Sequence, residues 1–348
     1  MRKFDYSFLR NISLDNKILS ATNYIHGIRA DEENKKRQHK KIFEKMVALA
    51  IVRSVKASNA IEGIVTTDKR IAAIVNQNSS PLNHSEKEIA GYRDALKLVH
   101  ENYDKVGFTE QDILGLHSIL LSLAETSFRG KYKEQDNVII SIDQHGTRSI
   151  RFRPLSARET KQGMEQLVLA YADAKQDTSI NQLLLIPCVI LDFLCIHPFM
   201  DGNGRMSRLL SLLLLYQNGY DAGKYISFEG AINDHKDEYY ETLYQSSLGW
   251  TNNENDYLPF IRNFIDTLYI CYQELDKRFD TLNNGIVTKE KRIEDVLLNS
   301  LLPMAKKEIS DLLPDISFST IERVLAVMLS EGRIVKYGTF KNARYQRK

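Results

Sequence analysis

The chain has 348 residues, of which 43% are hydrophobic and 26% are charged, and its formal net charge is only +2. This length and composition predict a folded globular protein with two or three packing units and exclude a disordered chain. The nearly balanced charge gives no global argument for binding nucleic acid or a membrane surface, so a charged partner would have to be recognised by a local cluster.

The cysteines and the apolar stretches indicate the cellular setting. Cys188, Cys195 and Cys271 are odd in number and scattered among apolar residues. Such a set predicts buried thiols in a reducing cytosol, not a disulfide framework or a metal cluster. No apolar core follows the charged N-terminal residues, and the apolar stretch 183–191 is shorter than the roughly 18 residues that a membrane span needs. We therefore expect a cytoplasmic protein with no membrane partner.

Most of the chain carries apolar residues at three- and four-residue spacing, which predicts amphipathic helices. The expected helices cover residues 39–61, 86–103, 109–124, 156–175, 205–217, 234–247 and 256–279. Residues 138–142 and 149–152 are instead rich in β-branched side chains and flank a turn at 143–147. This pattern predicts a single β-hairpin, within residues 137–154, embedded in a helical domain.

The last part of the chain predicts a separate small unit over residues 286–348. Residues 280–285 have the composition of a linker. Helical patterns follow near 290–302, 305–312 and 319–330, with Pro314 between the second and the third, and Ser319 and Glu322 have the spacing of a capping box. A strand–turn–strand pattern over 333–340 ends the chain. Helices followed by a hairpin resemble a winged-helix domain.

The strongest chemical signal is the string HPFMDGNGRMSR at residues 197–208. Gly202, Asn203 and Gly204 favour turn conformations that gather successive backbone N–H groups into one concavity at the start of a helix, and such a concavity binds phosphate. Arg205 and Arg208 are three positions apart, so they share a helix face and can reach the same polyphosphate.

Two further side chains in the string complete a candidate reaction centre. Asp201 is a hard oxygen ligand beside the anion site, which suits Mg²⁺ bridging phosphate oxygens. His197 can accept a proton at neutral pH. Together these groups predict a site for phosphoryl or nucleotidyl transfer. A plain turn after a helix stop is the structural alternative, but two arginines at a helix start oppose its dipole and need another reason.

The string matches the Fic motif, His-Pro-Phe-x-Asp/Glu-Gly-Asn-Gly/Lys-Arg-x-x-Arg, without departure, and the chain resembles the Fic family over about residues 40–275. The resemblance implies a mainly α-helical fold: a Fic helical-bundle core at 106–280 with a β-hairpin flap at 137–154. It also implies transfer of AMP from ATP, with Mg²⁺, to a Ser, Thr or Tyr hydroxyl of a target protein or of the chain itself. Doc-like members that transfer phosphate carry Lys at the position of Gly204, so this glycine favours AMP transfer.

The resemblance also implies roles for the residues of the motif. His197 would deprotonate the hydroxyl, and Asp201 would hold Mg²⁺. The backbone of residues 202–204 would line the anion hole. Arg205 would neutralise the β- and γ-phosphates, and Arg208 would fix the γ-phosphate.

The hairpin resembles the flap with which the family holds its targets. An extended target segment would pair with the unpaired edge of the hairpin, beside Val138, Ile139, Ile140, Arg151 and Phe152. Residues 144–158 contain four arginines and no acidic residue, which suits an acidic partner as well as it suits a solvated basic loop: Arg148, Arg151, Arg153 and Arg158. Tyr239 and Tyr240 resemble aromatics that contact adenine in relatives, although paired tyrosines on a helix are also common core residues.

An inhibitory element is indicated upstream of the motif. Ser58 and Glu62 lie four positions apart at the end of the predicted helix 39–63, and Gly63 is a natural helix stop. This segment, in an N-terminal helical region at 1–105, resembles the Ser/Thr-x-x-x-Glu-Gly/Asn inhibitory motif of Fic proteins. The resemblance implies that Glu62 pairs with Arg208 and takes the place of the γ-phosphate, and in some relatives such a glutamate also supports removal of AMP.

Two other functions stay open on the sequence. Residues 334–348 contain five basic residues and no acidic one, so the winged-helix-like unit could bind DNA, and the Fic core would then serve as a nucleotide sensor. The few charged residues of the helix 319–330 favour a protein-docking or dimerising role over DNA binding. A Fic variant that transfers another phosphate-containing group is the second alternative. Homo-oligomerisation, the target and the signal that releases Glu62 are left open.

Overall fold

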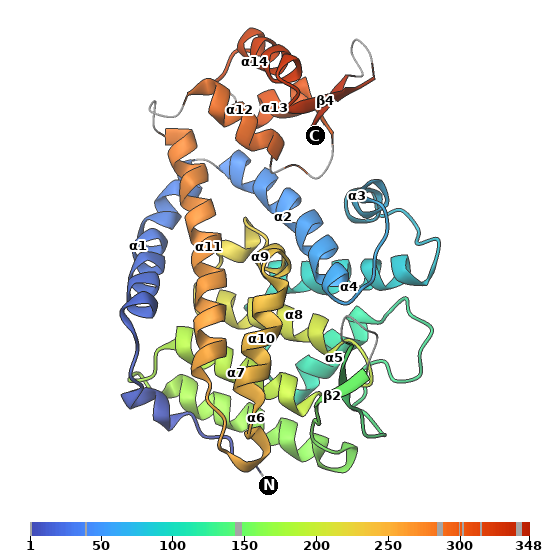
Figure 1. Cartoon of the computed structure of the whole chain (residues 1–348), viewed down its shortest axis with the longest axis vertical. Coiled ribbons are helices and arrows are strands. Elements are labelled where there is room, and N and C mark those ends of the chain that lie inside the picture. The colour runs from blue at the N-terminus through green and yellow to red at the C-terminus, as the bar shows by residue number, and fades with distance from the viewer. Residues whose placement is uncertain are drawn as a thin grey trace.

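The computed structural model describes residues 2–38, 40–142, 148–283, 288–298, 300, 303–313, 315–338 and 343–348, and it is mainly helical (Figure 1). The three cysteines are free thiols and are buried, as expected. Within the described residues, no helix combines the length and the apolar character that crossing a membrane requires.

The N-terminal part is a set of helices that packs on the rest of the core. It contains η1 (Ser7–Asn11), α1 (Asn16–Gln38), α2 (Lys40–Ile61), α3 (Asp68–Gln77) and α4 (His84–Asn102). Thr67 and Asn83 cap α3 and α4 by accepting a hydrogen bond from a backbone N–H of the first turn. Helix α1 packs along α11 (Leu258–Asn283), and α2 packs on α4 and α9 (Phe228–Asp234).

The centre of the molecule is formed by α7 (Gln182–Ile196) and α8 (Asn203–Gln217). Every residue of α7 from Leu183 to Ile196 is buried, and α8 is buried almost throughout, because a helix that is apolar all round has no face to offer to water. Around them lie α5 (Glu110–Leu120), α6 (Ala157–Gln176), η2 (Ala222–Lys224), α10 (Lys236–Ser247) and η3 (Trp250–Asn252) (Figure 1). The motif at 197–208 therefore lies at the junction of the two innermost helices.

The predicted hairpin is present between α5 and α6. Strands β1 (Ile139–Ile142) and β2 (Arg148–Phe152) are antiparallel, and Ile139 pairs with Phe152 while Ile140 pairs with Ile150. This register leaves Arg151 as an extra residue on β2, which is a β-bulge. The turn predicted at 143–147 and the side chain of Arg148 lie outside the described residues.

Residues 289–347 form a second hydrophobic cluster that shares no residue with the main one. It contains α12 (Lys289–Leu298), β3 (Met304–Ala305), α13 (Lys306–Leu312), α14 (Phe318–Ser330), β4 (Ile334–Tyr337) and β5 (Arg344–Arg347), with the antiparallel strand order β3-β5-β4. The winged-helix assignment of this unit and the domain boundaries stay predictions. Pro314 and residues 339–342, which include the basic Lys341, lie outside the described part of the chain.

Several expectations about local structure were wrong. The second strand predicted within 333–340 lies at Arg344–Arg347 (β5) instead. The predicted linker at 280–285 is helical up to Asn283, where α11 ends, and the linker positions 284 and 285 lie outside the described residues. The cap of α14 is Ser317, whose side chain accepts from the N–H of Thr320, so the capping box placed at Ser319 is not formed. The helices α1, α3 and α7 were not predicted, and the predicted helix 234–247 begins only at Lys236.

Candidate active site

The loop between α7 and α8 is shaped by two residues with positive φ. His197, directly after α7, has φ 51° and ψ 61°, and its N–H donates to the carbonyl of Phe193 at 3.0 Å. Gly202, directly before α8, has φ 82°. A left-handed conformation is rare for a residue with a side chain, so its appearance at His197 shows that the surrounding contacts enforce this turn.

Asn203 and His117 fix the conformation of the loop through hydrogen bonds to its backbone. The Asn203 amide oxygen accepts from the Phe199 N–H at 2.9 Å, and its amide nitrogen donates to the Phe199 carbonyl at 2.8 Å. His117, on α5, accepts from the Gly130 N–H at its Nδ1, so its Nε2–H donates to the Asp201 carbonyl at 3.1 Å. Its ring also stacks on Phe199 with centroids 3.7 Å apart. The Asn203 side chain therefore closes the loop instead of facing a ligand.

The His197 imidazole is neutral at pH 7. Its pKa is lowered to about 4, mainly by burial and in smaller part by the Lys133 ammonium, against the opposing effect of the hydrogen bond to the Leu194 carbonyl. Nδ1 lies 3.3 Å from that carbonyl, so the tautomer protonated at Nδ1 donates there. Nε2 is then left with a free lone pair and can accept a proton.

Lys133 is a site residue that the sequence reasoning missed. Its Nζ donates to the carbonyl of Ile196 at 3.1 Å and to the Asn137 side chain at 2.9 Å, and its backbone N–H donates to the Pro198 carbonyl at 2.8 Å. Burial lowers the pKa of this ammonium to about 8. Lys133 thus joins the approach to the hairpin to the backbone on either side of His197.

Asp201 and Arg205 form a pair on the other side of the loop. Arg205 is only 1% exposed and lies 2.7 Å from Glu88 of α4 and 3.3 Å from Asp201. The Asp201 side chain stays 55% exposed, and its other oxygen accepts from the Gly202 N–H at 2.6 Å. Glu88 was not identified from the sequence, because nothing in the order of residues shows that α4 reaches α8.

The donor set around Asp201 fits Mg²⁺ bound together with phosphate. Magnesium is usually held by one or two carboxylates plus phosphate oxygens and waters, so it needs no all-protein cage. Among the described residues, no cluster of three or more His, Cys, Asp and Glu side chains is arranged for a metal. Asp201 offers an exposed carboxylate at the N-terminus of α8, where a helix also favours an anion.

Glu62 and Arg208 meet where α2 ends. The Arg208 Nη2 lies 2.8 Å from the Glu62 carboxylate and 2.9 Å from the Ser58 carbonyl, and its Nε donates to the Ser58 hydroxyl at 2.8 Å. Burial alone raises the pKa of Glu62, but Arg208, with help from Arg205 and Lys236, outweighs it and holds this pKa below its ordinary value. Glu62 is therefore an anion at neutral pH.

The Glu62 carboxylate lies directly against the start of α8. A β-carbon placed on Gly204 would stand 2.1 Å from Glu62 Oε1, so only glycine allows the carboxylate this close. Gly63, with φ 77°, turns the chain away immediately after Glu62. Lys236 of α10, which was also missed, donates to the Ile61 carbonyl at 2.7 Å and fixes the end of α2.

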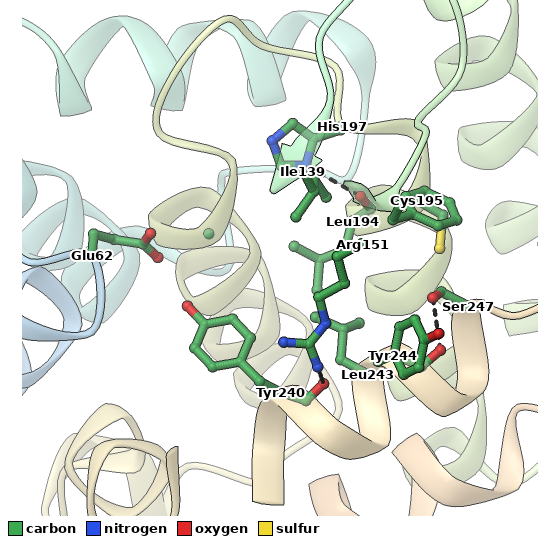
Figure 2. Close-up of a pocket in the computed structure, with 12 residues that line it drawn as sticks. Glu62, Ile139, Arg151, Leu194, Cys195, His197, Tyr240, Leu243, Tyr244 and Ser247 are labelled. Carbon is green, nitrogen blue, oxygen red and sulfur yellow. Dashed lines mark hydrogen bonds between the residues drawn. The ribbon is translucent and has the colours of Figure 1, made fainter. Parts of the chain in front are cut away.

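A pocket opens between this carboxylate, His197 and the hairpin (Figure 2). It encloses about 170 Å³, and it is lined by Glu62, Ile139, Arg151, Phe152, Leu194, Cys195, His197, Gly204, Tyr240, Leu243, Tyr244 and Ser247. Figure 2 shows Arg151 entering from the hairpin and lying beside Tyr240 and Tyr244. Tyr240 thus lines the pocket, whereas Tyr239 is buried in edge contact with Phe260. Leu243, Tyr244 and Ser247 were not predicted.

Comparisons with known proteins agree with this architecture. Residues 107–215 match the model of the Fic/DOC family. The "Protein adenylyltransferase Fic" of Nematostella vectensis is 27% identical over 215 residues, which are 59% of this chain and 44% of that protein. The "Protein adenylyltransferase fic-1" of Caenorhabditis elegans is 25% identical over 260 residues, 72% of this chain and 45% of the relative. The chain thus spans less than half the length of these two curated relatives.

Solved structures share the fold. A Fic family protein from Desulfovibrio desulfuricans superimposes with a TM-score of 0.63 at 20% identity and covers 97% of both chains. A Fic domain containing signaling protein from Bacteroides thetaiotaomicron gives a TM-score of 0.60 at 20% identity, over 72% of this chain and 94% of that one. Residues 107–215 thus carry a domain that matches the Fic/DOC family, and the solved structures show that the chain shares the fold of Fic proteins.

Proposed function

We propose that the chain is a protein adenylyltransferase: it transfers AMP from ATP, with Mg²⁺, to a Ser, Thr or Tyr hydroxyl of a target protein or of itself, and Glu62 restrains this activity. The proposal is supported most directly by the meeting of Glu62, Arg208 and Gly204 at the edge of a pocket that also holds a neutral His197. The adenylyltransferase names of the relatives point the same way.

In the proposed reaction the target oxygen forms a bond to the α-phosphorus of ATP, and the bond from that phosphorus to the β-phosphate oxygen breaks. Pyrophosphate leaves, and the hydroxyl proton goes to Nε2 of His197. The backbone N–H groups at the start of α8 and Arg208 would stabilise the phosphate charge. Asp201 would hold Mg²⁺, which, when bound, neutralises charge on the phosphate oxygens.

Arg205 is assigned a positioning role within this proposal. Its contacts with Glu88 and Asp201 orient the exposed carboxylate toward the helix start. The family resemblance implies in addition a direct contact between Arg205 and the β- and γ-phosphates.

The restraint follows from competition for the same positive groups. Glu62 is an anion bonded to Arg208 and seated on Gly204, and the γ-phosphate of ATP would need both places. ATP bound beside Glu62 would be displaced from the orientation needed for transfer, and one substitution at Glu62 should restore that orientation.

The test compares the wild-type chain with Glu62→Gly and Glu62→Gly/His197→Ala, each incubated with Mg-ATP and with a cell extract, followed by intact-mass measurement. We expect an adenylyl mass increase with Glu62→Gly and none once His197 is also replaced. Equal labelling of the wild type and Glu62→Gly would contradict the proposal that Glu62 restrains the activity. Absence of labelling in all samples would contradict the proposal that the chain is an enzyme.

Labelled ATP separates the related activities. Transfer of the α-phosphorus label to protein indicates AMP transfer, and transfer of the γ-phosphorus label would instead indicate a phosphate-transferring variant. Loss of AMP from purified modified protein, abolished by changing Glu62, would add de-AMPylation to the proposal.

A further inference from the structure

The two faces of the hairpin β1–β2 differ in a way that bears on which target segment can be modified. Val138, just before β1, and Ile140 are 42% and 48% exposed, and Ile150, which pairs with Ile140, is 50% exposed. Side chains two apart on a strand, and side chains directly opposite each other across a pair, share a face. These three residues therefore form one outward aliphatic row.

The opposite face of the hairpin closes the reaction pocket. Ile139 lines the pocket that contains His197 (Figure 2). Its cross-strand partner Phe152 lines the same pocket. Phe152 also packs edge-on toward Trp250, with centroids 6.4 Å apart. The bulge places Arg151 on this face as well, because the extra residue interrupts the alternation of β2.

We propose that the hydroxyl residue modified by this chain lies between two aliphatic residues in an extended segment of the target. The inference rests on the proposed function and names the substrate class of the same site. A segment that pairs with the hairpin edge takes up the same alternation of faces as the hairpin itself. The acceptor side chain must point to the pocket face to reach His197, so the residues before and after it point to the face that carries Val138, Ile140 and Ile150.

The aliphatic row explains why the flanking residues should be apolar. Neighbouring side chains on adjacent strands approach to roughly 5 Å, so the flanking residues of the target would cover the exposed aliphatic groups and remove them from water. Charged flanking residues would instead be desolvated against Ile140 and Ile150 without a partner. Main-chain pairing tolerates many target sequences, but the positions directly before and after the hydroxyl residue would require apolar side chains.

The occupant is an extended target segment and not a second copy of the chain, because the row is continuous with the pocket through paired residues. Ile139 and Ile140 are neighbours on one strand, and their partners Phe152 and Ile150 flank the bulge on the other. Whatever strand lies beside His197 on one face of the hairpin must present its alternate side chains to the other face.

The first experiment uses the full-length Glu62→Gly chain with two isomeric acceptor peptides of one composition. One peptide carries Ile and Val directly before and after the hydroxyl residue, and the other carries them two positions away. We expect kcat/KM for AMP transfer to be about tenfold higher for the first peptide, a modest value for one or two apolar contacts. Equal values for the two isomers would overturn the inference.

Variants locate the preference on the hairpin. In the Glu62→Gly background, Val138→Thr/Ile140→Thr/Ile150→Thr should abolish the difference between the isomers. Leu169→Thr, which changes a 59% exposed aliphatic residue of α6, should leave the difference unchanged. A preference that persists in the triple variant would exclude the aliphatic row as its source.

Peptide binding keeps this inference separate from the proposed reaction. Fluorescence anisotropy with the Glu62→Gly/His197→Ala chain measures peptide binding without AMP transfer. The first peptide should bind more tightly than the second. If the hydroxyl is never adenylylated but the first peptide still binds more tightly, the proposed activity is contradicted and the preference for aliphatic flanking residues is supported. If the triple variant instead converts a dimer to a monomer in sedimentation and leaves the peptide order intact, the row belongs to a second copy and the inference is overturned.

Discussion

Arg208 shows how a single buried cation organises the site. It is 1% exposed and bonds three oxygen atoms, two from Ser58 and one from Glu62. Buried guanidinium groups are tolerated when their donors are satisfied, so the contact between Arg208 and the end of α2 uses Ser58 as well as the carboxylate. The Ser58 hydroxyl is thus part of the contact that keeps Glu62 in place.

Ser58→Ala should destabilise the chain. The substitution leaves Nε of Arg208 without its hydroxyl partner in a buried place, at a cost of about 1–3 kcal/mol. Urea unfolding measures the change, with Ser20→Ala on the exposed surface of α1 as the control, where we expect an effect within about 0.5 kcal/mol. A Ser58 variant as stable as the control would mean that Arg208 finds another acceptor.

His100 should make a pH-dependent contribution to stability. It is buried in α4 with its Nε2 3.3 Å from the Tyr216 hydroxyl, and burial, assisted by Lys224, lowers its pKa to about 3. The folded protein therefore holds His100 neutral at pH values where the unfolded chain, with a pKa near 6.5, binds a proton. Its contribution is complete above about pH 6.5 and is lost as the pH falls toward 3.

Comparison with His100→Gln isolates this contribution from the other titrating groups. The free energy of unfolding of the wild type should fall by roughly 2 kcal/mol more than that of the variant between pH 7 and pH 5. Denaturant unfolding at the two pH values gives the difference. Parallel pH dependences of the two proteins would show that His100 titrates alike in the folded and unfolded chains.

The residues of the motif could be predicted because they are contiguous in the sequence. Most of the residues that contact them could not be predicted. His197, Asp201 and Arg208 stand in one string of letters, and the approach of Glu62 followed from the family resemblance. Glu88, His117, Lys133 and Lys236 come from elements that only the folded chain brings to the loop. Such contacts leave no periodic or local signal in a single sequence.

At the scale of elements, the crossing of α4 and α5 depends on a close backbone approach. A β-carbon on Gly91 would stand 2.1 Å from the carbonyl oxygen of Leu120, and this oxygen belongs to the backbone at the end of α5. Because α4 also carries Glu88, the distance between these helices helps to set where Arg205 and Asp201 lie.

Gly91→Ala should therefore be strongly destabilising although alanine is the better helix former. Overpacking of this kind costs about 1–3 kcal/mol, which exceeds the gain of about 1 kcal/mol from helix propensity. Gly115→Ala on α5 is the matched control, since no atom lies within 4 Å of its added β-carbon, and it should be neutral or stabilising. Thermal unfolding of both variants measures the difference. Similar melting temperatures would contradict the close approach of Gly91 to the Leu120 carbonyl.

The strands were predictable as elements, but their register was not. β-Branched residues on both sides of a turn indicated a hairpin at 137–154, and the structure has β1 and β2 there. The bulge at Arg151 depends on which residues pair across the hairpin, and composition does not specify that. Helix α7 was missed for a related reason, since a helix buried on all sides has no amphipathic period.

At the scale of the whole molecule, the part of the chain that the structure describes contains two separate hydrophobic clusters. One extends from Tyr6 to Leu275 and contains the site, and the other extends from Ile293 to Tyr345. Clusters that share no residue each have their own core, and such units can unfold separately.

A chain that ends at Asn283 should keep the fold of the larger cluster. Calorimetry of the full chain should show two transitions, and the shortened chain should retain one of them with its melting temperature changed by less than about 4 °C, the shift expected from about 1 kcal/mol in a domain of this size. Aggregation or a lower transition in the shortened chain would indicate that the two clusters stabilise each other.

The double hydrogen bond between Asn203 and Phe199 also has a chemical consequence. Asparagine followed by glycine is the dipeptide most prone to deamidation in flexible chains, where the next backbone nitrogen attacks the side-chain amide. Here the amide is engaged on both its atoms, and Gly204 lies in the first turn of α8. The Asn203-Gly204 pair that shapes the anion site would deamidate quickly in an unfolded chain, and the fold protects it from this reaction.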